Sequence, residues 1–363
     1  MSNSTLAPSP YADEKGRLYY YDNAKFILIF LVVLAHALSP FKDSGGSGIV
    51  FMYLWRVINT LHMPCLIFIS GFFAKKYIRP DGTINVQRPF TYIMYYLFAQ
   101  VTVAAFEMFV LKDDITPSFF APRSSLWFLV CLIWWYCFLP LVDRVKPEIM
   151  FPVAVLLGLF LAYDPKLNGS MSISRVVTHY PFFLAGYYIT PQTFEKIYSK
   201  KARIISIPVG IVALLSQLAI TLLFKPYGDV INFSINKFIT CDTPYATIFK
   251  NSSLTPLLWF VPRVWFYICA AMLCFAFLAW VPRKKYFFTK YGARTLAVYI
   301  LHRYLYLAYL DYRWYEYLDA VPYLRLAIFP IALVITLVFS TYPFWYPFKL
   351  LGKIKINKFI KTK

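Results

Sequence analysis

A small set of ionisable side chains interrupts the long apolar runs of this sequence, and these residues are where chemistry could occur. In chain order they are Lys25, His36, Arg56, His62, Glu107, Arg263, His302 and Arg303. A charged side chain at the centre of a membrane helix costs roughly 3 kcal/mol, so each marks a functional site or a buried structural pair. Imidazoles can accept a proton near neutral pH, and cations can bind phosphate groups.

Lys25 and His36 share one face of the first apolar run. Their separation of eleven residues returns them to nearly the same side of a helix, about 16 Å apart along its axis. A cation at the mouth and an imidazole at depth would suit a long donor with phosphates at one end and a reactive group at the other. In the alternative interpretation, Lys25 extends to the membrane surface and His36 bonds a neighbouring carbonyl.

Two further runs carry polar stripes. Arg56, Asn59 and His62 precede a proline in the second run, which could equally be a kinked packing helix. In the ninth run, His302 and Arg303 follow a tyrosine at positions i+3 and i+4 and share its face. Here Arg303 could bind an anion, or it could pair with Glu107 of the third run.

The sequence predicts a protein dissolved in lipid rather than in water. Hydrophobic residues make up 60% of the 363 residues and charged residues only 15%, which is unlike a soluble domain. The apolar runs have the length that a helix needs to cross about 30 Å of hydrocarbon. We expect about ten spans, at residues 24–40, 50–74, 90–111, 125–142, 148–163, 173–190, 203–224, 257–281, 295–311 and 323–346. The predicted fold is therefore all-α, a polytopic transmembrane helical bundle.

The net charge of +20 does not indicate a nucleic-acid partner, because the basic residues follow the predicted topology. Lysines and arginines concentrate in alternate loops and in the C-terminal tail, as the positive-inside rule describes for cytoplasmic segments. We expect both termini in the cytoplasm, with an N-terminal segment 1–23, a transmembrane domain 24–346 and a basic tail 347–363. The six cysteines show no metal or disulfide spacing.

Five motifs in order resemble the acyltransferase-3 superfamily of integral membrane acyltransferases, and within it the fucose 4-O-acetylase-like branch. They are DNAKFILIFLVVLAHAL at 22–38, the stretch from HMP to ISGFF at 62–73, SSLWFL at 124–129, HYPFFLAGYYI at 179–189 and GARTLAVYILH at 292–302. Many members have arginine where this chain has Lys25, which keeps the charge but loses bidentate phosphate geometry.

The resemblance implies a multi-pass membrane enzyme that carries acetyl from cytoplasmic acetyl-CoA to a hydroxyl of a sugar or glycan at the outer face. We expect no metal, and the plasma membrane is the default location. His36 is then the catalytic residue, either a general base or a transient acyl carrier. The residues expected to bind the donor are Lys25, Arg56 and Arg303. Those expected to bind substrate are His62, Ser70, Glu107, Trp127, Arg263, Tyr299 and His302. His62, Ser70 or Tyr299 could donate to the oxyanion.

Two readings from other classes compete. Intramembrane charges and a proline-kinked helix would also suit a transporter or flippase of a small polar or glycan substrate, although the sequence shows no pair of related halves. The same fold could also serve as a membrane scaffold or sensor without catalysis.

Overall fold

The computed structural model describes residues 11–13, 16–43, 45–79, 81–166, 170–223, 235–250 and 255–358. Within these ranges the chain is helical, and it forms no strand beyond two isolated bridges. This confirms the all-α prediction for the described residues.

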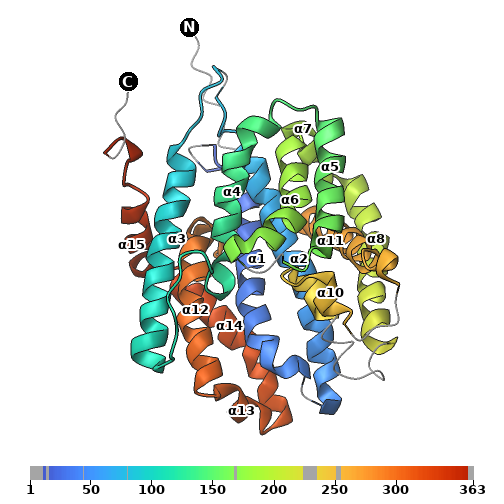
Figure 1. The fold of residues 1–363 in the computed structure, drawn as a ribbon, viewed down its shortest axis with the longest axis vertical. Coiled ribbons are helices and arrows are strands. Elements are labelled where there is room, and N and C mark those ends of the chain that lie inside the picture. Colours follow the sequence, from blue (N-terminus) through green and yellow to red (C-terminus); the bar gives the residue numbers. More distant parts are fainter. Residues whose placement is uncertain are drawn as a thin grey trace.

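The α-helices, with the labels of Figure 1, are α1 (Tyr19–Leu38), α2 (Gly45–Ala74), α3 (Gln87–Phe106), α4 (Trp127–Val142), α5 (Pro147–Phe160), α6 (Ile173–Tyr188), α7 (Pro191–Ile197), α8 (Lys200–Leu223), α10 (Tyr245–Ile248), α11 (Val261–Trp280), α12 (Thr295–Asp311), α13 (Trp314–Asp319), α14 (Ile328–Phe339) and α15 (Tyr342–Leu351). Residues 235–240 are also helical.

The long helices form one bundle with α1 near its middle (Figure 1). Helices α3, α12, α14 and α15 lie on one side of α1, and α5, α8 and α11 lie on the other side. The first and last described segments lie at the same, upper end of the bundle, and α13 closes the lower end.

Five helical stretches of the described chain are long and apolar enough to cross a membrane. They are Tyr19–Lys42, Gly48–Ala74, Gln87–Leu111, Lys200–Leu223 and Pro256–Trp280. Helices α4, α5, α6 and α12 also form where spans were expected, but they have only 16, 14, 16 and 17 residues. At about 1.5 Å per residue such helices are shorter than the hydrocarbon layer, so the number of complete crossings stays a prediction.

The last expected span, 323–346, is not one continuous helix. A bend of 52° separates the stretch Tyr323–Phe339 from α15. Pro343 occupies the first turn of α15, where its missing N–H costs nothing but where it cannot extend the preceding helix. The break falls at Ser340 and Thr341, but the apolar residues on both sides of this polar pair led to the expectation of a single span.

Helices α2 and α6 cross at a pair of glycines. A Cβ atom at Gly71 would overlap the backbone carbonyl of Phe183, and one at Gly186 would overlap that of Phe68. Glycine is therefore required at both positions, because the two backbones touch there. This crossing fixes how the rest of α2 and α6 approach each other toward the lower end of the bundle.

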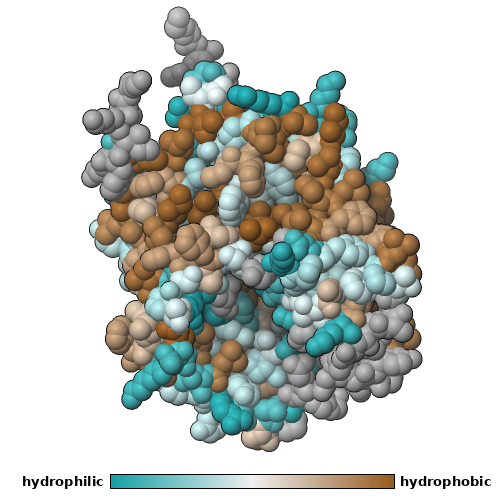
Figure 2. Space-filling view, in the orientation of Figure 1, coloured by the Kyte–Doolittle hydropathy of each residue, from teal (hydrophilic) through white to brown (hydrophobic). Residues whose placement is uncertain are grey.

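The surface of the upper and middle part of the bundle differs in polarity from that of the lower part. Hydrophobic side chains cover most of the upper and middle part of the face in Figure 2, whereas hydrophilic ones gather in its lower part and around a hollow near the centre. Exposed aliphatic residues on α5, α8 and α14 extend this apolar surface. A broad apolar surface of this kind is what lipid contact requires.

Candidate functional site

A polar cavity of about 190 Å³ opens in the lower half of the bundle. Side chains from α1, α2, α4, α6 and α12 and from the segment 239–240 line it. They include His36, Asn59, His62, Ser125, Trp127, Arg175, His179, Thr240, Tyr299 and Tyr306. The cavity is smaller than the roughly 300–1,000 Å³ of pockets that enclose drug-sized ligands, so it has room for a reacting group rather than for a whole nucleotide-bearing donor.

His36 stands close to the lower end of α1 and belongs to two cavities at once. Its ring centroid lies 5.2 Å from that of His302 and 4.8 Å from that of Tyr306. Beyond it is a second cavity of about 160 Å³, lined mainly by aliphatic and aromatic residues of α1, α12, α13 and α14. All four histidines of the sequence line one or both cavities.

The other three histidines are held in one orientation by their own helices. Nδ1 of His62 lies 2.6 Å from the carbonyl of Ile58, and Nδ1 of His302 lies 2.8 Å from that of Val298. Nδ1 of His179 makes the same contact one turn back, at 3.2 Å. A carbonyl can only accept a hydrogen bond, so Nδ1 carries the proton and each neutral ring presents Nε2 as an acceptor.

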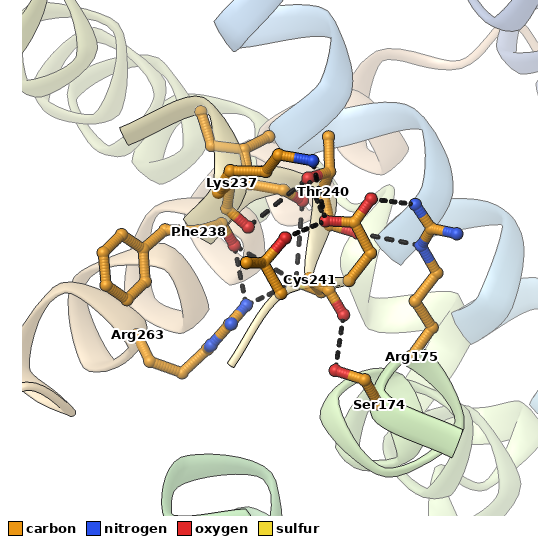
Figure 3. A network of polar contacts seen from close by, with 10 residues as sticks. Ser174, Arg175, Lys237, Phe238, Thr240, Cys241 and Arg263 are labelled. Carbon is orange, nitrogen blue, oxygen red and sulfur yellow. Dashed lines mark hydrogen bonds and ion pairs between the residues drawn. The ribbon is translucent and has the colours of Figure 1, made fainter. Parts of the chain in front are cut away.

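Arg175 connects the polar cavity to the segment 237–242, which we call the cover because its Ile239 and Thr240 line one wall of the cavity. Its guanidinium lies 5.0 Å from the centre of the Trp127 ring. Nε donates to the carbonyl of Thr240 at 2.9 Å, and Nη2 binds Asp242 at 2.8 Å (Figure 3). Two of its five N–H groups are thereby used, and the remainder can reach a ligand.

Asp242 is the acceptor at the centre of this network. Besides Arg175 it binds the hydroxyls of Thr240 and Thr243 and lies 3.6 Å from Lys237. Burial raises the pKa of the Asp242 carboxyl, but Arg175, Lys237 and the hydroxyls of Thr243 and Thr240 together lower it by more, so the pKa lies below its usual value.

Arg263 holds the same segment from the other side. The side chain is fully buried and donates to the carbonyl of Phe238 at 2.6 Å and to the sulfur of Cys241 (Figure 3). Ser174 donates to the carbonyl of Cys241 at 2.9 Å. Arg263 does not line either cavity, so the structure places this expected substrate-binding residue behind the cover of the site.

Trp127, His62 and Tyr299, also expected to bind substrate, do line the polar cavity. The hydroxyl of Tyr299 donates to the backbone carbonyl of Ser125. This bond joins α12 to the helical turn just before α4. The Tyr299 hydroxyl proton, which was expected to bond an oxyanion, is therefore already used. His302 lines the apolar cavity and contacts the ring of His36.

Three other expected residues lie in the upper half or at a helix interface. Lys25 pairs with Asp22 at 2.9 Å, near the upper end of α1. Arg56 is buried between helices, with Thr221 at 3.1 Å and Asn236 at 3.0 Å. Ser70 donates to the carbonyl of Leu66, one turn back in α2. None of the three lines the polar or the apolar cavity.

Glu107 and Arg303 do not pair with each other, contrary to one interpretation of the sequence. Glu107 binds Arg123 at 3.0 Å instead. The guanidinium of Arg303 lies 4.9 Å from the centre of the Tyr306 ring, and its buried Nε and Nη1 have no hydrogen-bond partner among the described residues. Arg303 therefore stands behind Tyr306, one side chain away from His36.

Sequence reasoning missed Arg175, His179, Thr240 and Tyr306 as site residues. Arg175 and His179 are ionisable, stand at i and i+4 within an expected span, and could have been found by the rule that identified the others. Thr240 and Tyr306 carry no comparable signal. Across the described ranges, no three His, Cys, Asp or Glu side chains are grouped so that they could hold a metal ion.

Comparison with known proteins agrees with the acyltransferase resemblance at the level of the family. No curated protein and no solved structure matches the chain. The sequence pattern of the acyltransferase domain family, acyltransferase 3, matches residues 18–345, which include every residue that lines the two cavities. This match favours an acyltransferase over the transporter and scaffold alternatives. The chain therefore belongs to the acyltransferase-3 family of membrane acyltransferases.

Proposed function

We propose that this protein transfers a short acyl group, acetyl in the simplest case, from acyl-CoA to a hydroxyl of a sugar or glycan. The protein then belongs to the fucose 4-O-acetylase-like branch and lies in the plasma membrane. Both of its termini are in the cytoplasm, and its polar cavity lies toward the outer face. The observation that carries it is the position of His36, where a hydrogen-bonding cavity meets an apolar one.

The polar cavity suits a polyol. The Nε2 atoms of His62 and His179 accept hydrogen bonds from hydroxyls, and the amide of Asn59 and the spare N–H groups of Arg175 donate to them. The ring of Trp127 adds an apolar surface of the kind against which the C–H face of a sugar packs.

His36 acts on the acceptor as a general base. It takes the proton from the acceptor hydroxyl while that oxygen attacks the thioester carbonyl, and the tetrahedral intermediate then expels the thiolate. The C–O bond forms, the C–S bond breaks, and the thiolate leaves with the proton from His36. An acyl carrier role for His36 would give the same products in two steps.

The developing oxyanion needs a donor other than His62 or Tyr299. With Nδ1–H held by a carbonyl, neutral His62 has no second proton to donate, and the hydroxyl of Tyr299 is already bonded. Arg175 has spare N–H groups at the cavity, and Arg303 adds positive charge behind Tyr306. Lys25 and Arg56 remain candidates for the donor phosphates only if donor binding frees them from their present contacts.

The test uses purified protein in sealed vesicles with labelled acetyl-CoA on one side and a glycan mixture on the other. Wild-type protein should release CoA and label the glycan, and His36→Ala should reduce turnover about 10²- to 10⁴-fold. Leu141→Ala, on an exposed face of α4, is the matched control and should keep full turnover. Equal turnover in the wild type and His36→Ala would discard His36, and no CoA release by either would contradict the enzyme itself.

A further inference from the structure

The apolar cavity adjoins the polar cavity at His36, but few of its lining side chains are polar. His36 and Tyr306 line both cavities. The other residues of the second cavity are mostly aliphatic or aromatic and include Val33 and Ala37 of α1, Leu305 of α12 and Ile331 of α14. None of the described residues that line it is a lysine, arginine, aspartate or glutamate.

Its size exceeds what an acetyl group needs. A buried apolar cavity of about 150 Å³ binds benzene. The 160 Å³ here, which opens to the surface beside the exposed Leu305 and Ile331, therefore has room for about six carbon atoms. The methyl of acetyl would fill a small part of it and leave much of the apolar lining without a contact.

We propose that this cavity binds the hydrocarbon chain of the donor's acyl group, so that the preferred donor is an aliphatic acyl-CoA of about four to six carbons. This inference rests on the proposed function. The acyl carbonyl lies beside His36, the acceptor hydroxyl attacks it from the polar cavity, and the chain extends to the apolar side. The chain stays attached to that carbonyl while C–S breaks and C–O forms, so one cavity serves both thioester and ester.

A lipid chain carried by the acceptor fits the cavity less well. An acyl chain begins at the reacting carbon, and that carbon must lie at the junction that His36 marks. The chain of a lipid-linked sugar begins beyond the sugar, commonly after phosphate. No lysine or arginine lines the described cavity to neutralise a phosphate there.

The experiment measures binding of CoA, acetyl-CoA, butyryl-CoA and hexanoyl-CoA to the protein in nanodiscs, with empty nanodiscs subtracted. Each buried methylene should tighten binding about fourfold, so butyryl-CoA should bind at least tenfold more tightly than acetyl-CoA. Ile331→Phe fills the cavity from α14 and should abolish this gain while acetyl-CoA binding remains. Val334→Phe on the same helix, 57% exposed and outside the cavity, is the matched control and should keep the gain.

Ala37→Leu, which fills the cavity from α1, is the second test should Ile331→Phe fail to fold. Equal binding of all acyl-CoAs, or a chain-length gain that survives both filling variants, overturns the inference and leaves the proposed function standing. Binding of an alkyl glycoside to the same nanodiscs tests the acceptor. If the filling variants weaken its binding and keep the chain-length gain, the cavity belongs to the acceptor and the inference is wrong. If neither CoA nor any acyl-CoA binds, the result contradicts both the proposed function and this inference.

Discussion

Helices α2 and α6 behave differently at their two ends. At Gly71 and Gly186 their backbones touch with no space for a single methyl group. Two to three turns away, His62 and His179 of the same helices face an open cavity. The same two helices therefore pack backbone to backbone at one level and line a cavity at another.

This difference separates stability from chemistry within one pair of helices. The crossing is dry, uses backbone contact and carries no ionisable group, so it holds the pair together. The level of His62 and His179 instead leaves a space that polar side chains line. Rigid support two turns from a site is what keeps catalytic geometry within a fraction of an ångström.

The crossing should be the more sensitive region to a single added methyl. Gly186→Ala would place Cβ inside the carbonyl of Phe68, so the helices must move apart at a cost of about 3 kcal/mol or more. Thermal unfolding in detergent would measure this loss of stability.

Gly210→Ala provides the control for that prediction. Gly210 is a buried glycine within α8, but its Cβ would meet only the methyl of Ala276, at 3.1 Å. A gain in helix propensity of up to about 1 kcal/mol offsets this contact. Equal unfolding temperatures for the two variants would contradict the assignment of α2 and α6 as the fixed crossing.

The cavity-lining part of the pair should lose activity with little loss of stability. His179→Phe keeps the ring contacts with Trp127, Phe182 and Phe266 but removes the Nε2 acceptor, together with the Nδ1–H that bonds the carbonyl one turn back, which the helix already bonds. A hydrogen bond lost to substrate is worth about 1–3 kcal/mol, or roughly 5- to 150-fold in kcat/KM. Steady-state kinetics at an unchanged unfolding temperature would check it, and unchanged kinetics would remove His179 from the site.

The sequence predicted the helices better than their ends. Apolar runs located a helix at every expected span, because lipid solvation demands such runs. The break before α15 was missed because the residues on both sides of it are apolar, although Ser340, Thr341 and Pro343 mark it in the sequence. The contact between α2 and α6 was equally hidden, since a glycine at a crossing and a glycine elsewhere look alike in one sequence.

For the site, ionisable residues within apolar runs were correctly identified as either functional or structurally paired. The sequence did not show which of the two roles each residue has. His36, His62 and Tyr299 line the polar cavity, whereas Arg56 and Arg263 bind backbone and side-chain oxygens outside it. The difference depends on which helices face one another. That information lies in the tertiary contacts and not in the spacing of residues along one helix.

The bonds by which Arg175 holds the cover should contribute less to stability than the crossing of α2 and α6. Arg175→Lys keeps the charge but cannot bond Thr240 and Asp242 together as the guanidinium does. Since the ion pair is partly exposed, we expect a loss of about 1 kcal/mol. Hydrogen exchange of the amides at 237–242 would detect it as faster local opening. Unchanged exchange would mean that Arg263 and Ser174 hold the cover without Arg175.

The smallest effect should come from pH at Asp242. The pKa of its carboxyl is lowered in the folded protein, so the stabilisation from its ion pairs is fully present above the unfolded value of about 3.9 and is lost only as pH falls below it. Between pH 5 and 8, in the range where histidines titrate, the carboxyl therefore stays charged. The pH profile of kcat/KM for Asp242→Asn should be parallel to that of the wild type across this range, displaced by a constant factor. A change in the shape of the profile would show that Asp242 titrates with the reaction, and the cover would then be part of the chemistry instead of its support.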